Sequence, residues 1–249
     1  MAQIITLHSF RGGTGKSGVA ANLAVLMAKM GKRVGLIDMD IQSPSLQVIF
    51  GLQEPSPVLN DYLWEKAKID KVAYDITTDL GGDVSGKLFL IPSSIKPREI
   101  SRVLRDGFDP TLVNEAFKKL RTKLELDVLL VDTHAGINEE TVLTITVSDT
   151  VIVLLRPDQL DYIGTNMSLE MTRRLNVGKV LVLVNKAPQT LDLDELKKTI
   201  QSKYDYHVAA VIPNSDELRL LTSTAIFALR HPQHAITQTY QQLAEMLLA

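Results

Sequence analysis

A glycine-rich stretch near the N-terminus has the residue types that bind phosphate. It follows an apolar run at residues 4–7 and precedes a helical pattern at residues 18–30. Glycines let successive backbone N–H groups turn toward an anion, a lysine can reach the β and γ phosphates of a nucleotide, and a hydroxyl can bind Mg²⁺. These groups come from Gly12, Gly13, Thr14, Gly15, Lys16, Ser17 and Gly18. The stretch therefore predicts a nucleotide site in which Ser17 is a ligand of Mg²⁺.

Two residues of this stretch differ from an ordinary phosphate-binding loop. Such a loop carries glycine five residues before Gly15, and this chain has Phe10 there. Arg11 adds a positive charge among the glycines, and its guanidinium offers a fork of donors that suits phosphate oxygens. Arg11 is therefore a candidate phosphate ligand, the alternative being a solvated loop residue.

Carboxylates follow two other apolar runs of strand length. Asp38 and Asp40 come directly after the run at residues 34–37, and Asp132 follows the run at residues 128–131. Acidic side chains at such places are candidates to orient a water molecule or to help hold a metal ion. Ordinary alternatives stay open, because aspartates also cap helices and end strands in proteins without such chemistry.

Strand-like and helix-like segments alternate along the chain and must position these residues. Continuous apolar runs indicate strands that are buried on both faces. The runs cover residues 4–7, 34–37, 88–91, 128–131, 151–155, 180–184 and 208–212, and the clearest helical patterns cover residues 18–30, 110–124, 162–175, 194–203 and 237–248. The alternation predicts an α/β fold with a doubly wound, mainly parallel sheet and helices on both faces.

The domain organisation follows from the same pattern. A length of 249 residues suits one large core, and we expect a single domain over residues 1–249. Residues 42–86 are the least regular part, with room for a hairpin or short helices but no clear domain boundary. Sheets of this class bind ligands beyond the carboxyl ends of their strands, which is where the glycines and aspartates lie.

Composition narrows the class of protein. Hydrophobic residues make up 45% and charged residues 22% of the chain, and the formal net charge is −2, so nucleic-acid binding would need a local basic patch. The sequence contains no cysteine, which excludes disulfides, thiolate zinc sites and thiolate-held clusters. No segment reaches the roughly 18 apolar residues of a membrane span. These features predict a cytoplasmic protein.

The motifs together resemble the ParA/MinD family of deviant Walker A ATPases. The resemblance rests on Arg11-Gly12-Gly13-Thr14-Gly15-Lys16-Ser17, Asp38-Met39-Asp40 and Val131-Asp132-Thr133-His134-Ala135-Gly136, and continues at Val184-Asn185-Lys186 and Val211-Ile212-Pro213. It implies a doubly wound domain that binds ATP and Mg²⁺ and hydrolyses ATP slowly. It also implies an ATP-dependent homodimer with ATP sandwiched between the two subunits.

The family pattern assigns roles to individual residues. Lys16, Mg²⁺ and Arg11 would neutralise charge on the phosphates, while Asp38 or Asp40 orients the attacking water. Asp132 would hold Mg²⁺ directly or through water. Asn185 would contact the adenine edge and Pro213 its face, although Pro213 is also a good helix-entry residue.

One position departs from the family. Its members carry lysine where this chain has Arg11, and that lysine contacts the partner subunit's nucleotide. The resemblance implies the same cross-subunit contact for Arg11, with Arg156 as the alternative cation.

The resemblance also suggests the cellular role. The leading hypothesis is a positioning ATPase whose ATP-bound dimer binds nucleoid DNA nonspecifically and is released by an adaptor on its cargo, which could be a plasmid, a chromosomal locus or a protein organelle such as a carboxysome. Candidate DNA contacts are the basic runs Arg98, Arg102, Arg105 and Lys118, Lys119, Arg121, Lys123. After Arg230 the sequence has no lysine or arginine, so we expect no membrane-targeting helix of the MinD type. The alternative is an ATP-binding scaffold that localises division or flagellar proteins without DNA.

Overall fold

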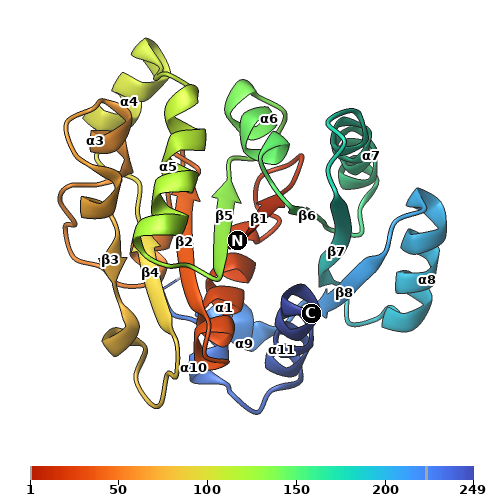
Figure 1. Ribbon diagram of the computed structural model, residues 1–249. Coiled ribbons are helices and arrows are strands. Elements are labelled where there is room, and N and C mark those ends of the chain that lie inside the picture. The colour runs from red at the N-terminus through yellow and green to blue at the C-terminus, as the bar shows by residue number, and fades with distance from the viewer. Residues whose placement is uncertain (1, 222–223) are drawn as a thin grey trace.

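The computed structural model describes residues 2–221 and 224–249, and its centre is one eight-stranded sheet with the order β3-β4-β2-β5-β1-β6-β7-β8 (Figure 1). Seven strands pair in parallel, and only the short edge strand β3 runs antiparallel to its neighbour β4. The strands are β1 (Gln3–His8), β2 (Arg33–Met39), β3 (Tyr74–Asp75), β4 (Lys87–Ile91), β5 (Val128–Thr133), β6 (Thr150–Leu155), β7 (Lys179–Ala187) and β8 (Val208–Pro213). The predicted mainly parallel sheet is confirmed.

Helices cover both faces of this sheet. The α-helices are α1 (Lys16–Lys29), α2 (Leu46–Ile49), α3 (Leu59–Leu63), α4 (Pro97–Asp106), α5 (Thr111–Lys123), α6 (Glu139–Thr146), α7 (Gln159–Arg174), α8 (Leu193–Tyr204), α9 (Asp216–Leu220), α10 (Phe227–Arg230) and α11 (Ala235–Leu248). Short 3₁₀ helices η1 (Ile69–Lys71) and η2 (Thr77–Leu80) lie between α3 and β4. Residues 42–86 thus contain short helices and one edge strand.

Alternate residues of each central strand face opposite cores, as the strand period requires. In β1, Ile5 and Leu7 pack with α1 and α11, whereas Ile4 faces the core under α5. A third cluster lies under α7 and α8 and includes Val151 and Val153 of β6. Figure 1 shows α1 and α11 on one side of the sheet and α5, α6 and α7 on the other. This burial on both faces explains why most residues of the central strands are apolar.

The last helix, α11, belongs to the core. Its residues Ile236, Tyr240, Leu243 and Leu247 are buried in the cluster that contains α1. No helix within the described residues combines the length and the apolar character needed to cross a membrane.

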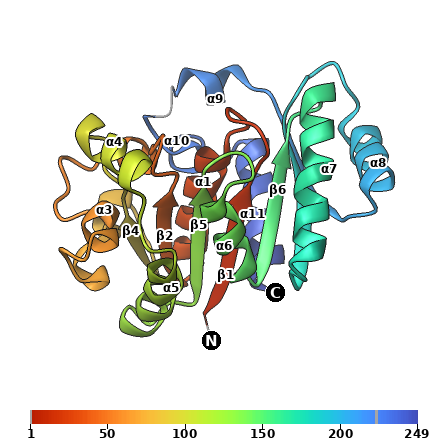
Figure 2. The ribbon, with the colours of Figure 1, turned by 90° about the horizontal axis from the view of Figure 1, so that it is seen from above.

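The carboxyl ends of the parallel strands meet at one edge of the sheet. The loop after β1 leads into α1, and the loops after β2, β4 and β5 open at the same edge. Viewed from above, α9 lies at this edge and both chain termini lie at the opposite one (Figure 2). The candidate site residues are therefore brought together by strand order, although they are far apart in sequence.

Candidate active site

The glycine loop between β1 and α1 has the backbone of a phosphate cradle. Gly13 and Gly15 have φ angles of 77° and 93°, in the left-handed region that favours glycine, and α1 begins at Lys16. A Cβ on Gly15 would lie 2.5 Å from Nδ2 of Asn185, so this position also lacks space for a side chain. The loop ends where the positive end of α1 starts, which favours a bound anion.

The side chain of Ser9, which precedes the glycines, forms hydrogen bonds to three residues of the loop. Its Oγ accepts hydrogen bonds from Thr14 Oγ1 at 3.0 Å and from Lys16 Nζ at 3.1 Å, and donates to the Arg11 carbonyl at 2.7 Å. Burial lowers the pKa of Lys16, and the carboxylates of Asp132 and Asp40 oppose that shift. Lys16 is thus held in place before a nucleotide arrives. Ser9 could not be predicted from the sequence, where its only signal is a hydroxyl close to the glycines.

The two aspartates after β2 have different environments. Asp38 is fully buried, and its carboxylate accepts backbone N–H bonds from Asp40 at 3.2 Å and from Ser45 and Leu46 at 3.0 Å each. Burial raises the pKa of Asp38 well above its usual range. Both of its oxygens are therefore used to fold the loop after β2. Asp38 thus has a structural role at the start of α2, whose N-cap is Ser45.

Asp40 instead faces the loop after β5. Its Oδ1 lies 2.7 Å from Nδ1 of His134 and accepts a 3.0 Å bond from the Ser43 N–H. The Asp40 side chain is 14% exposed, so it keeps access to the site. Sequence analysis quoted His134 as part of a motif but gave it no role.

Asp132, at the end of β5, is fully buried. Neither carboxylate oxygen has a hydrogen-bond partner among the described residues. Burial raises the pKa of Asp132 to about 7, while the neighbouring Ser17 hydroxyl and the Lys16 charge oppose the rise. An orphaned buried carboxylate beside a serine hydroxyl and a lysine fits Mg²⁺ and its bound water, because both supply the partners that the oxygens lack.

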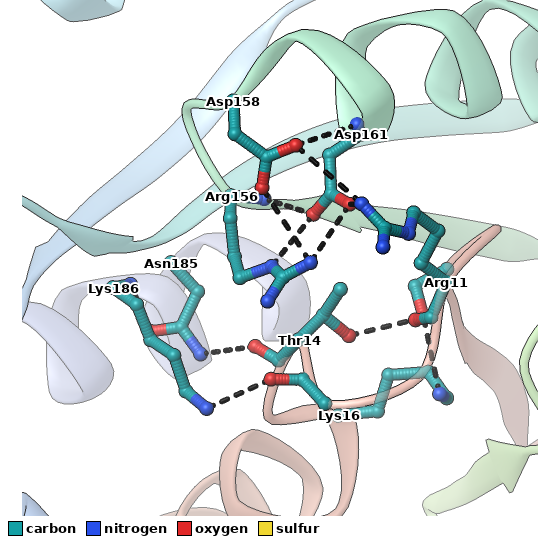
Figure 3. A network of polar contacts seen from close by, with 10 residues as sticks. Arg11, Thr14, Lys16, Arg156, Asp158, Asp161, Asn185 and Lys186 are labelled. Carbon is teal, nitrogen blue, oxygen red and sulfur yellow. Dashed lines mark hydrogen bonds and ion pairs between the residues drawn. The ribbon is translucent and has the colours of Figure 1, made fainter.

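Arg11 and Arg156 converge on the same two carboxylates at the start of α7 (Figure 3). Arg156 binds Asp161 through two bonds, of 3.0 Å from Nε and 3.1 Å from Nη2. Nη1 of Arg11 lies 3.5 Å from Asp161 and 3.7 Å from Asp158. Burial alone would raise the pKa of Asp161, but these partners lower it. Arg11 is 40% exposed and lies farther from Asp161 than Arg156 does, so Arg11 is held less tightly than Arg156.

Phe10, which replaces the first glycine of an ordinary loop, packs against Gly164. A Cβ on Gly164 of α7 would overlap the Phe10 ring, so the ring lies directly on the glycine backbone. The phosphate-binding loop is therefore packed against α7 by shape, in addition to the ion pairs of Arg11.

Asn185 and Lys186, at the end of β7, contact the loop from the other side (Figure 3). Asn185 Nδ2 donates to the Thr14 carbonyl at 2.7 Å, and Lys186 Nζ donates to the Gly13 carbonyl at 2.8 Å. Both residues line a cavity of about 360 Å³ that extends from Gly15 and Gly18 toward α9 and α10. That volume and position suit a purine base.

Pro213 lies at the end of β8, beside Ala187. The N-cap of α9 is Ser215, whose Oγ accepts from the Leu218 N–H at 3.2 Å, so Pro213 is not the entry residue of that helix. The cavity wall on this side comes from residues that sequence analysis did not single out, namely Leu218, Arg219, Leu221, Ala225 and Phe227.

The family model described as "AAA domain" matches residues 2–180, which include the glycine loop and all three aspartates. The chain is a P-loop ATPase of the ParA/MinD family. Members of this family are ATPases, so ATP hydrolysis is the activity of this chain.

Relatives of several kinds share the whole length of this ATPase. An ATP-binding protein of Methanocaldococcus jannaschii is 29% identical and covers 100% of this chain and 88% of its own. A flagellum site-determining protein of Helicobacter pylori is 26% identical, covering 99% and 82%. The septum site-determining protein MinD of Pyrococcus horikoshii, solved with Mg-ADP, has a TM-score of 0.80 at 23% identity, covering 99% and 96%, and confirms the fold.

Proposed function

We propose that this ATPase is a positioning protein, a single ATPase domain over residues 1–249 that closes into an ATP-bound homodimer. In this proposal the dimer binds nucleoid DNA nonspecifically, and an adaptor on the cargo stimulates hydrolysis and releases it. The single observation that carries the ATP-dependent step is the exposed Arg11 beside the phosphate-binding loop, held only by ion pairs of 3.5 and 3.7 Å. Such a cation is free to contact another subunit's phosphates.

The chemistry requires positioning and charge neutralisation and no strong base. The backbone of residues 12–17 and the Lys16 ammonium hold the phosphates of ATP. Ser17 and Asp132 would hold Mg²⁺, which supplies charge neutralisation on the β and γ phosphates when bound. Asp40, with a carboxylate oxygen near the surface of the site, orients the attacking water, whereas Asp38 holds the loop that carries Asp40.

Contacts to the adenine base and to the second subunit complete the proposed site. Asn185 and Pro213 would contact the adenine edge and face, next to the cavity that Asn185 and Lys186 line. Arg11 would cross to the partner's ATP, with Arg156 as the alternative.

A second candidate is a scaffold that localises flagellar or division proteins without DNA, and the flagellum site-determining relative supports it. The two candidates differ in one measurable property. A positioning ATPase of the first kind binds DNA only when loaded with ATP, and a scaffold ignores DNA.

The deciding experiment measures ATP turnover with and without duplex DNA, alongside a DNA shift assay at several salt concentrations. ATP-dependent, salt-sensitive binding supports the first candidate, and indifference to DNA at every salt concentration supports the second. In the same assay Asp40→Ala should abolish phosphate release and keep the ATP-bound dimer, visible by light scattering. Undiminished phosphate release would remove Asp40 from the mechanism.

A further inference from the structure

A basic groove lies between α4 and the segment that follows α3, away from the glycine loop. The groove has a volume of about 870 Å³, and one wall contains Trp64. Its five cations are Lys66, Lys96, Arg98, Arg102 and Arg105, against the single carboxylate of Glu99. We call this surface the α4 groove. It is a local concentration of positive charge on a chain whose formal net charge is −2.

Two of these cationic side chains pack against the ring of Trp64. The Arg102 guanidinium lies 4.2 Å from the centre of the Trp64 ring, and Lys66 Nζ lies 5.1 Å from it. A guanidinium stacked on an aromatic face keeps its in-plane N–H donors free for a ligand. Trp64 therefore orders two cations without neutralising them.

Carboxylates neutralise only part of the groove. Asp106 pairs with Arg105 at 2.8 Å and with Arg102 at 3.7 Å. Within residues 2–221 and 224–249, Lys66, Lys96 and Arg98 have no ion-pair partner. Lys96 is the N-cap of α4 and Arg98 is in its first turn, where the helix dipole disfavours cations. An anionic ligand would relieve this repulsion.

The spacing of the arginines favours a ligand with regularly spaced anionic groups. Arg98, Arg102 and Arg105 are four and three residues apart on α4, so they share one helix face over about 10 Å. A DNA strand carries one phosphate per roughly 3.4 Å of helix axis, so a row of phosphates can meet all three. We propose that the α4 groove binds the phosphodiester backbone of duplex DNA, an inference that rests on the proposed function and gives its DNA contact a location.

The groove opens at the same edge of the sheet as the nucleotide site. The segment from β4 to α4 is attached to the loop that carries the catalytic aspartate, because Ser93 Oγ donates to the Asp38 carbonyl at 2.7 Å. Next to it, the Ser94 N–H donates to Oδ1 of Asn60 on α3 at 2.8 Å. One short segment thus joins the floor of the nucleotide site to the start of α4.

The test reverses two groove charges in the full-length protein. In Lys96→Glu/Arg98→Glu the new carboxylates lie at the N-terminal end of α4, where the dipole favours them, so the helix stays folded. The control, Lys197→Glu/Lys198→Glu on α8, changes the net charge equally at the far end of the sheet. DNA binding is measured with a short duplex, the ATP-loaded protein and several salt concentrations. Basal ATP turnover should stay unchanged in both variants.

Trp64 is the only tryptophan of the chain, so its fluorescence reports directly on the groove. In the wild type and the control, saturating duplex should change the emission. In the groove variant the affinity should fall at least 10-fold more than in the control, and the slope of log affinity against log salt should decrease by about 2, because two phosphate contacts are lost.

Different outcomes would overturn different statements. If the wild type binds DNA and both double variants lose affinity equally, the groove assignment is wrong and the proposed function stands. If the ATP-loaded wild type binds no DNA at any salt concentration, both are wrong. If polyglutamate changes Trp64 emission at lower concentrations than the duplex does, the groove binds an acidic protein, and the DNA assignment is again wrong.

Discussion

Nδ1 of His134 lies 2.7 Å from Oδ1 of Asp40, which joins the loop after β5 to the loop after β2. The carboxylate accepts this bond, so the Nδ1–H of the imidazole holds one Asp40 oxygen while the site stays open to water. In the proposed mechanism, where Asp40 orients the attacking water, His134 is therefore a positioning residue.

We expect His134→Ala to lower kcat on the order of 10-fold with little change in KM, because a mispositioned Asp40 affects the transition state more than ATP binding. His134→Asn should restore most of the rate, since its amide places an N–H donor close to the position of Nδ1. Steady-state phosphate release tests both. Equal losses in the two variants would show that the ring matters only for packing.

Substitution of Arg11 and substitution of Arg156 should have different effects on dimerisation and on stability. Arg11→Ala should bind nucleotide but lose ATP-dependent dimerisation, whereas Asp161 stays paired with Arg156 and the fold is unchanged. Arg156→Ala should lower the free energy of unfolding by about 2 kcal/mol, because Asp161, only 2% exposed, loses two charged hydrogen bonds.

Light scattering with a nonhydrolysable ATP analogue and urea denaturation measure the two properties. Arg173→Ala, on helix α7 that carries Asp161 and with a side chain 68% exposed, is the control. A normal dimer from Arg11→Ala, with none from folded Arg156→Ala, would transfer the cross-subunit contact to Arg156.

Gly164→Ala should weaken ATP binding although it adds a good helix former to α7. An alanine in a helix interior ordinarily stabilises by about 1 kcal/mol relative to glycine. Here the new Cβ overlaps the Phe10 ring, and displacing the ring moves the phosphate-binding loop. The control is Gly178→Ala, whose Cβ would lie an ordinary 3.6 Å from the Asp149 carbonyl. Calorimetric ATP titration compares them, and equal affinities would refute the role of this contact.

His8, under the phosphate-binding loop, should make stability depend on pH. Burial, assisted by the Lys16 charge, lowers the pKa of His8 from 6.5 to about 3. Between these values the unfolded chain binds a proton that the folded chain does not, so stability falls as pH falls below 6.5. From pH 6.5 to pH 5 the His8 contribution is a loss of about 2 kcal/mol.

His8→Gln should reduce this loss, because its amide does not titrate and can still bond to Ser168. Urea denaturation at pH 7 and pH 5 gives the free energies. Parallel pH profiles for the two proteins would contradict the prediction.

The sheet could be predicted from sequence because strands buried on both faces contain runs of apolar residues, such as Val128 to Val131 in β5. Helix α4 was not predicted, although Ile100, Val103 and Leu104 follow a helical spacing, because the helix has only ten residues and Val103 alone is buried. Helix α6, with eight residues, was too short to show a period.

In the candidate site, too, residues with a local sequence pattern could be predicted and residues without one could not. The glycine loop and Asp132 could be chosen as candidates from the sequence because the chemistry of phosphate and Mg²⁺ binding fixes their local spacing next to a strand. Ser9 and Lys186 were missed because their roles depend on contacts that only the folded chain creates. The separation of 94 positions between His134 and Asp40 shows why such contacts leave no pattern in sequence.

The packing of Phe10 on Gly164 also constrains the order in which mutations could accumulate in the ancestry of this ATPase. Glycine at position 10 would leave space around position 164, so a later change from glycine to a larger residue there would be tolerated. The reverse order passes through an intermediate in which ring and side chain occupy the same volume. A path to glycine at position 10 and a larger residue at position 164 therefore has to begin at position 10.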